Sequence, residues 1–162
     1  MDEQGRPRMV DVAAKPETTR IAIAEGSIRM SAEALALIVG NSSPKGDVLS
    51  TAELAGTMGA KRTAELIPLC HPVGLDHISV HAVAEPDLPG VRVTAQAKAI
   101  GRTGVEMEAL TAAAVALLTV YDMVKSVGHD LEIGNVHLLQ KTGGRSGDWH
   151  RPHRSSTGLR EG

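Results

Sequence analysis

Residues 103–128 of this 162-residue chain, TGVEMEALTAAAVALLTVYDMVKSVG, decide its fold. The middle of the stretch is apolar on nearly every side, which is typical of a helix buried between a sheet and another subunit. Thr103 and Glu106 have the spacing of a capping box, and Gly128 stands where a helix commonly ends. The pattern therefore predicts one long buried helix over residues 103–127.

Alternating apolar and polar residues on both sides of this helix predict strands. We expect strands over residues 18–30 and 131–139, and a hairpin of two strands joined by residues 85–90, EPDLPG. Ser31 is placed to cap a helix over residues 32–39, and Asp47 to cap a helix that runs to about Leu66. This order predicts an α+β fold, a ferredoxin-like split βαβ sandwich with an antiparallel sheet and one long buried helix.

The ends of the chain are polar, and the length suits one domain. We expect a flexible N-terminal arm over residues 1–17, a single catalytic domain over residues 18–150 and a disordered tail over residues 151–162.

Composition excludes several classes of protein. The 17 basic and 19 acidic residues give a net charge of −2, so no general attraction to nucleic acid is expected. One Trp, one Tyr and no Phe leave no platform for stacking bases. The chain has no uninterrupted apolar window of membrane-spanning length and no secretory leader pattern. The single cysteine cannot form an internal disulfide, which favours a cytoplasmic location.

Charged residues stand at both ends of the long predicted helix. Asp122 and Lys125 share one helical face, and such pairs are often solvated surface pairs. Here they follow an almost wholly apolar stretch, which favours a cavity or an interface and an acid–base role, with Lys125 titrating near neutral pH if it is desolvated. Glu106 is expected mainly to cap the helix, whereas Glu108 is free for proton transfer.

The segment Ile67–Val73, IPLCHPV, places a cysteine beside a histidine between prolines. Adjacent residues of an extended chain point to opposite sides, so Cys70 and His71 are not expected to face one ligand together. No second cysteine completes a zinc site, and no metal site is predicted. Cys70 is expected to be a small buried residue, and His71 a group held in position by a rigid turn. The remaining histidines are interpreted as surface residues: His77, His81, His129, His137, His150 and His153.

Two basic glycine-containing loops are candidates for phosphate binding. Lys45-Gly46-Asp47 precedes a helix N-terminus, where backbone N–H groups attract anions, although no Walker motif is present. Lys141–Gly147, KTGGRSG, combines three glycines with two cations. Either loop by itself is a weak signal.

The two charged ends of the long helix are too far apart for one ligand. Fourteen residues separate Glu108 from Asp122, roughly 21 Å at about 1.5 Å per residue. If both ends act in catalysis, the simplest arrangement brings the Glu108 end of one subunit to the Asp122–Lys125 end of another.

Six motifs together resemble the MoaC family over residues 9–148. They are Met9-Val10-Asp11-Val12, Lys45-Gly46-Asp47, LIPLCHP at 66–72, TGVEMEALT at 103–111, Tyr121-Asp122-Met123-x-Lys125 and Lys141-x-Gly143-Gly144-x-Ser146-Gly147. The resemblance implies a phosphorus–oxygen lyase of molybdenum cofactor biosynthesis. Such an enzyme converts 3',8-cyclo-7,8-dihydro-GTP into cyclic pyranopterin monophosphate and releases pyrophosphate. It also implies a homohexamer, a trimer of dimers with sites shared between subunits.

The resemblance further implies which residues act. Asp122, Lys125, Glu108 and His71 would be catalytic. Substrate would be bound by Leu69, Cys70, His71, Met107, Glu108, Lys45, Lys141 and Glu106. Arg102 and Arg145 stand where many members carry lysine, and charge is retained at both positions. No cofactor is implied, although a divalent metal such as Mg²⁺ can accompany the triphosphate. The alternative is a non-catalytic oligomeric scaffold that binds a pterin or nucleotide and delivers an intermediate to a partner enzyme.

Overall fold

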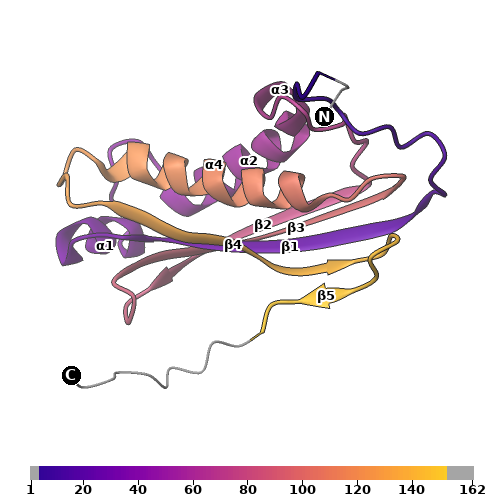
Figure 1. Cartoon of the computed structure of the whole chain (residues 1–162). Helices are drawn as coiled ribbons and strands as arrows, with labels where there is room; N and C mark the ends of the chain where they lie inside the picture. The colour runs from indigo at the N-terminus through magenta and orange to yellow at the C-terminus, as the bar shows by residue number, and fades with distance from the viewer. Residues whose placement is uncertain (1–3, 153–162) are drawn as a thin grey trace, which may run out of the picture.

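An antiparallel five-stranded sheet carries helices on one face in the computed structural model, which describes residues 4–152 (Figure 1). The strands lie in the order β2-β3-β1-β4-β5. The elements are β1 (Thr18–Arg29), α1 (Ala32–Val39), α2 (Val48–Lys61), α3 (Thr63–Leu66), β2 (His77–Glu85), β3 (Gly90–Gly101), α4 (Glu106–Val124), β4 (Glu132–Thr142) and β5 (Trp149–His150). The predicted α+β class with an antiparallel sheet and one long helix is confirmed.

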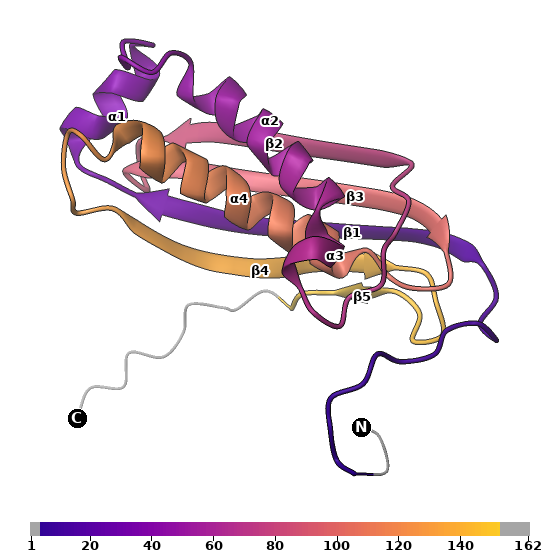
Figure 2. The ribbon, with the colours of Figure 1, turned by 90° about the horizontal axis from the view of Figure 1, so that it is seen from above.

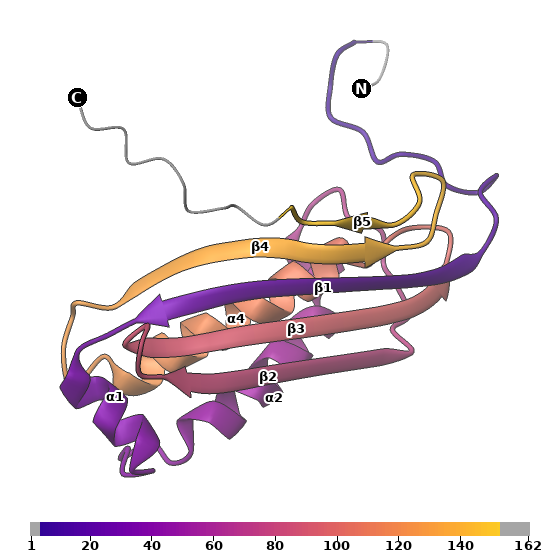
Figure 3. The same cartoon turned by 90° about the horizontal axis from the view of Figure 1, so that it is seen from below.

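The alternation of side chains along each strand separates the two faces of the sheet. Ala22 and Ala24 of β1 and Val93 and Ala95 of β3 are fully buried under the helices. The opposite face carries Ile21, Ile23 and Glu25 of β1 and polar residues of β3, and within residues 4–152 no helix lies over it (Figure 3). Because the core has almost no aromatic rings, it is built from small and branched aliphatic side chains, and the layers approach closely.

Two glycines allow α2 to cross α4 at short range, with the two helices running in opposite directions (Figure 2). A Cβ atom at Gly56 would lie 2.8 Å from the carbonyl oxygen of Ala112, and one at Gly59 would lie 2.8 Å from a methyl group of Val115. α4 is therefore held between α2 and the sheet. It is long and apolar enough to cross a bilayer by composition, but it lies here as the core helix.

Both predicted helix caps before the long helix are confirmed. The Ser31 side chain accepts a hydrogen bond from the Ala34 amide, and the Asp47 carboxylate accepts one from the Ser50 amide. The helix capped by Asp47 does not continue unbroken to Leu66 as predicted. Arg62 leaves helical geometry, and the Thr63 hydroxyl donates to the Ala60 carbonyl at 3.0 Å, which separates α2 from α3.

The predicted capping box of α4 is wrong. The helix starts at Glu106, and its N-cap residue, Val105, makes no side-chain capping bond. The Glu106 carboxylate instead folds back over Gly104, where a Cβ atom would collide with it. Glu106 is therefore released from the capping role for contact with a ligand.

The end of the sheet also differs from the prediction. β4 runs three residues beyond Leu139 and takes Lys141 into the sheet, and β5 was not predicted. Gly143 and Gly144, both at positive φ, turn the chain between β4 and β5. The Arg151 amide donates to the Leu139 carbonyl at 2.8 Å. Residues 153–162 of the predicted tail lie outside the described residues.

Substituting Gly56 tests the close crossing of α2 and α4. We expect Gly56→Val to lower the free energy of unfolding by about 1–3 kcal/mol, because the new side chain meets the rigid backbone of α4. Leu54→Val places the same side chain at a largely exposed position of α2 and should change stability by less than about 0.5 kcal/mol. Urea titrations at one protein concentration measure both, and equal midpoints for the two variants would contradict the account.

Candidate functional site

α4 divides the predicted site residues into two groups at its two ends. Near its N-terminal end lie Leu69, Cys70, His71, Glu106, Met107, Glu108 and Lys141. Near its C-terminal end lie Lys45, Asp122 and Lys125. The groups are roughly 21 Å apart along the helix, as the spacing predicted. A single chain therefore brings together each half of the predicted site but not the whole.

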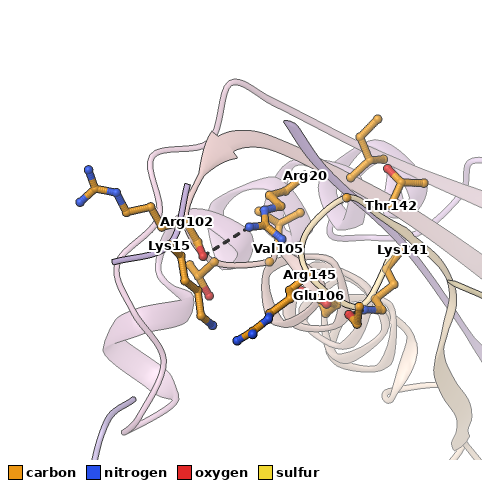
Figure 4. Close-up of a pocket in the computed structure, with 13 residues that line it drawn as sticks. Lys15, Arg20, Arg102, Val105, Glu106, Lys141, Thr142 and Arg145 are labelled. Carbon is orange, nitrogen blue, oxygen red and sulfur yellow. Dashed lines mark hydrogen bonds between the residues drawn. The ribbon is translucent and has the colours of Figure 1, made fainter. Parts of the chain in front are cut away.

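A cavity of about 380 Å³ opens beside the N-terminal end of α4. Five cations from different parts of the chain line it, and we call it the cationic cavity: Lys15, Arg20, Arg102, Lys141 and Arg145. The Arg102 guanidinium points outward in Figure 4, and its Nε lies 3.7 Å from the Glu17 carboxylate. Its wall also contains Thr103, Gly104, Glu106 and the glycine-rich turn after β4. So many cations around one acidic side chain favour a polyanionic ligand.

Arg20 joins the two segments that shape the cationic cavity. Its side chain, only 9% exposed, donates through Nε to the Gly101 carbonyl at 3.2 Å. It also donates through Nη2 to the Arg102 carbonyl at 3.4 Å, and Figure 4 draws this second bond dashed. Gly144 packs directly against its guanidinium, where a Cβ atom would collide with Nη1. The glycine-rich turn thus closes on a buried cation, and Gly144 allows the approach.

Sequence reasoning did not single out Arg20 or Lys15. On β1, Arg20 stands two residues before Ala22 and four before Ala24, so its side chain points to the same buried face of the sheet. A charged residue at that position indicated a buried cation. Lys15 lies in the segment predicted to be a flexible arm, where no periodicity marks it. Arg102 and Arg145, noted only as replacements for lysine, both line the cavity.

A second cavity of about 300 Å³ adjoins the first and shares Thr103, Gly104 and Glu106 with it. Its other lining residues define the Cys-His pocket: Ile67, Leu69, Cys70, His71 and Met107. The structure therefore brings the segment Leu69–His71 to Met107. A ligand with a polyanionic part and a planar part has adjoining spaces for both.

The polar contacts of Cys70 and His71 diverge, but both residues line the Cys-His pocket, unlike the expectation that they would not face one ligand together. The Cys70 sulfur lies 3.8 Å from Oε1 of Glu108, whereas Nε2 of His71 lies 2.8 Å from the Val10 carbonyl oxygen. Cys70 is half-buried and lines the pocket, so the prediction of a fully buried residue is wrong.

Glu108 lies behind Cys70 and is 2% exposed. Within the described chain its Oε2 atom has no hydrogen-bond partner. Burial raises the pKa of Glu108 above its ordinary value, and the carboxylate of Glu106 adds to the rise. The pKa of the Cys70 thiol is also raised, by burial and then by the charge of Glu108. This end of α4 therefore holds an acid that resists ionisation.

The opposite end of α4 holds an exposed ion-pair cluster. Asp122 accepts hydrogen bonds from Lys45 at 2.7 Å and from Lys125 at 2.8 Å, and all three side chains are about half exposed. Hydrogen bonds from Lys125 and Lys45 lower the pKa of Asp122 to about 2, and Asp122 raises the pKa of Lys125. The desolvation expected to bring Lys125 near neutral titration is thus not met in one chain.

Two residues of the loop Lys45-Gly46-Asp47 make hydrogen bonds within this chain. Asp47 itself accepts hydrogen bonds from the amide and the hydroxyl of Ser50, so a carboxylate already occupies the N-terminus of α2. Lys45 turns to the end of α4, where it also donates to the Asp122 backbone carbonyl at 2.8 Å. Lys45 and Lys141 therefore lie at opposite ends of α4.

The other histidines are scattered. His77, His81, His129 and His150 are exposed, His137 is half-buried, and His153 lies outside the described residues. Across residues 4–152, no three His, Cys, Asp or Glu side chains are arranged to hold a metal ion.

Comparison with known proteins finds a family model and relatives that agree with one another. The model of the MoaC family matches residues 9–144. A protein of Brucella ovis named cyclic pyranopterin monophosphate synthase is 55% identical over 149 residues, covering 92% of this chain and 90% of the relative. A protein of the same name from Cereibacter sphaeroides is 58% identical over 146 residues, covering 90% of this chain and 92% of the relative.

Replacing Glu108 by glutamine tests its burial. Because the pKa of Glu108 is raised in the folded chain, its ionisation opposes folding, and stability is lost as pH rises above the ordinary value of 4.5. Glu108→Gln removes this effect, so its urea midpoint should exceed that of the unmodified chain near pH 8 and converge with it below about pH 4.

The exposed Glu33→Gln on α1 controls for the loss of one negative charge. A midpoint difference between Glu108→Gln and the unmodified chain that stays constant with pH would refute the burial argument.

Proposed function

Because this chain belongs to the MoaC family, we propose that it converts 3',8-cyclo-7,8-dihydro-GTP into cyclic pyranopterin monophosphate and pyrophosphate in molybdenum cofactor biosynthesis. The observation that carries this proposal is the cationic cavity joined to the Cys-His pocket. The substrate has the same two parts, a triphosphate and a fused ring system. Both relatives described above carry the name of this synthase.

The cationic cavity suits the triphosphate. Lys141 and Arg145 flank the glycine-rich turn, Lys15 approaches from another segment, and buried Arg20 holds the walls together. Closing the cyclic phosphate breaks the bond between the α- and β-phosphorus groups and releases pyrophosphate. Fixed cations stabilise the charge that develops on that leaving group. A divalent ion such as Mg²⁺ would arrive with the triphosphate rather than on protein ligands.

The ring system would lie in the Cys-His pocket, between Leu69–His71 and Met107. Opening the guanine-derived ring and rebuilding it as a pyranopterin require proton transfers and no change of oxidation state. His71 and Glu106 line this space, and Glu108 stands behind Cys70. Glu108 is suited to donate a proton, because burial keeps it from ionising readily.

The Asp122–Lys125 pair completes the site when a second copy supplies it. Between the two ends of α4, an outward stripe of Leu110, Ala114 and Leu118 is partly or largely exposed, and Leu118 is 59% exposed. The midpoint between Glu108 and Asp122 falls at Val115. A two-fold axis near this point would pack the stripes of two copies together. It would also bring the Glu108 end of each copy to the Asp122–Lys125 end of the other.

Burial in such a contact would change the cluster at the C-terminal end of α4. Lys125 and Lys45 would lose water, and desolvation lowers the pKa of an ammonium group. Lys125 would then approach the neutral titration that acid–base catalysis needs, with Asp122 as its partner. Lys45 of that copy would join Lys141 of the first beside the triphosphate. We extend this arrangement to a homohexamer, a trimer of such dimers, as the family resemblance implies. The single cysteine favours a cytoplasmic location for it.

Asp122→Asn tests the acid–base assignment. With the cyclic GTP intermediate as substrate, the unmodified protein should release pyrophosphate. The variant should lose about a hundredfold or more in turnover, because the amide cannot exchange the proton. Substrate binding and oligomeric state should be kept, as measured by calorimetry and sedimentation.

Asp87→Asn, in the hairpin loop between β2 and β3, is the matched control and should turn over normally. Near-normal turnover by Asp122→Asn would remove Asp122 from the chemistry. Binding without pyrophosphate release by the unmodified protein would favour the scaffold alternative.

A further inference from the structure

We propose that residues Met9–Lys15, the strap, are part of the site, and that the Val10 carbonyl fixes the tautomer of His71 so that Nδ1 serves the substrate. This inference rests on the proposed function and deepens it. Val10 acts through its backbone, as a positioning residue. The strap falls within the segment that the sequence indicated to be a flexible arm.

The contact between Val10 and His71 decides which ring nitrogen carries a proton. The carbonyl oxygen of Val10 lies 2.8 Å from Nε2 of His71. A carbonyl oxygen only accepts hydrogen bonds, so Nε2 must be the donor. A neutral imidazole has one N–H group, and its other nitrogen, Nδ1, therefore carries the lone pair. Within residues 4–152, Nδ1 of His71 has no protein partner.

The strap has turns of its own that set its path. The Asp11 carboxylate accepts a hydrogen bond from the Ala13 amide at 2.8 Å, and the Lys15 amide donates to the Val12 carbonyl at 3.0 Å. From these turns Lys15 enters the wall of the cationic cavity. The strap thus leads from His71, close to α3, to the start of β1 and the cavity (Figure 1).

This course joins the two halves of the binding space. Val10 contacts the Cys-His pocket through His71, and Lys15 contacts the cationic cavity five residues later. A histidine whose Nε2 is already committed to the backbone offers Nδ1 as its only proton acceptor. In the proposed reaction, Nδ1 takes a proton from the ring system while Lys15 contacts the triphosphate.

The first experiment reads the tautomer directly and needs no substrate. Protein labelled with ¹⁵N only at histidine gives one pyrrole-type and one pyridine-type signal for a fixed neutral ring, and the His71 signals are assigned by their loss in a His71→Asn sample. The full chain should show protonated Nε2 and unprotonated Nδ1. A variant lacking residues 2–10 should show a mixture of tautomers. Val10→Ala keeps the backbone carbonyl and should match the full chain.

The second experiment asks which nitrogen the reaction uses. The side-chain amide of asparagine reaches the position of Nδ1, whereas that of glutamine reaches the position of Nε2. An amide cannot take up a proton, so both variants should lose about tenfold or more in turnover. Only His71→Asn keeps a hydrogen-bond acceptor at the position of Nδ1, so it should bind the substrate at least about threefold more tightly than His71→Gln. The deletion variant should lose about tenfold or more in kcat with a smaller change in KM, because the ring is still present but no longer fixed.

Protonated Nδ1 in the full chain, an unchanged tautomer in the deletion variant, or substrate binding by His71→Gln as tight as that by His71→Asn would each overturn the proposal. Failure of the proposed function is a separate result: the unmodified protein would release no pyrophosphate, whatever tautomer the ¹⁵N signals report.

Discussion

The close packing of α4 between α2 and the sheet is the constraint on which the rest of the structure depends. Gly56 and Gly59 remove the side chains that would hold the helices apart, and small residues of β1 and β3 do the same beneath. α4 is therefore a rigid rod, and the groups at its ends keep a fixed separation of roughly 21 Å. That separation divides the chemistry between two places and makes a second copy the natural source of the missing half.

The carboxyl groups at the two ends of α4 have shifted pKa values of opposite sign, because Glu108 is buried and Asp122 is exposed beside two lysines. At the N-terminal end the helix enters the core, and the carboxyl of Glu108 is buried with one unpartnered oxygen, which raises its pKa. At the C-terminal end Asp122 lies on the exposed face of the helix and meets two lysines, whose hydrogen bonds lower its pKa to about 2. Glu108 therefore resists ionisation, whereas Asp122 stays ionised. The first is suited to donate a proton and the second to accept one.

Local patterns predicted most of the fold, and long-range contacts account for most of what they missed. The caps at Ser31 and Asp47, the hairpin and the long helix follow from residue spacing, which the chain obeys locally. The capping role of Glu106 failed because its carboxylate turns over Gly104. The ion pair of Lys45 with Asp122 joins residues 77 positions apart, which no local pattern reveals. The role of Arg20 could be predicted only from its place in the alternation of β1, which points its side chain to the buried face.

The central claim is that one site takes Glu108 from one copy and Asp122 from another. Equal amounts of Glu108→Gln and Asp122→Asn protein, each inactive by itself, should be mixed under conditions where native mass spectrometry confirms subunit exchange. In a two-fold dimer, half of the randomised pairs are mixed, and one of the two sites in each mixed pair is intact. The account predicts recovery of about a quarter of normal pyrophosphate release. No recovery after confirmed exchange would contradict it.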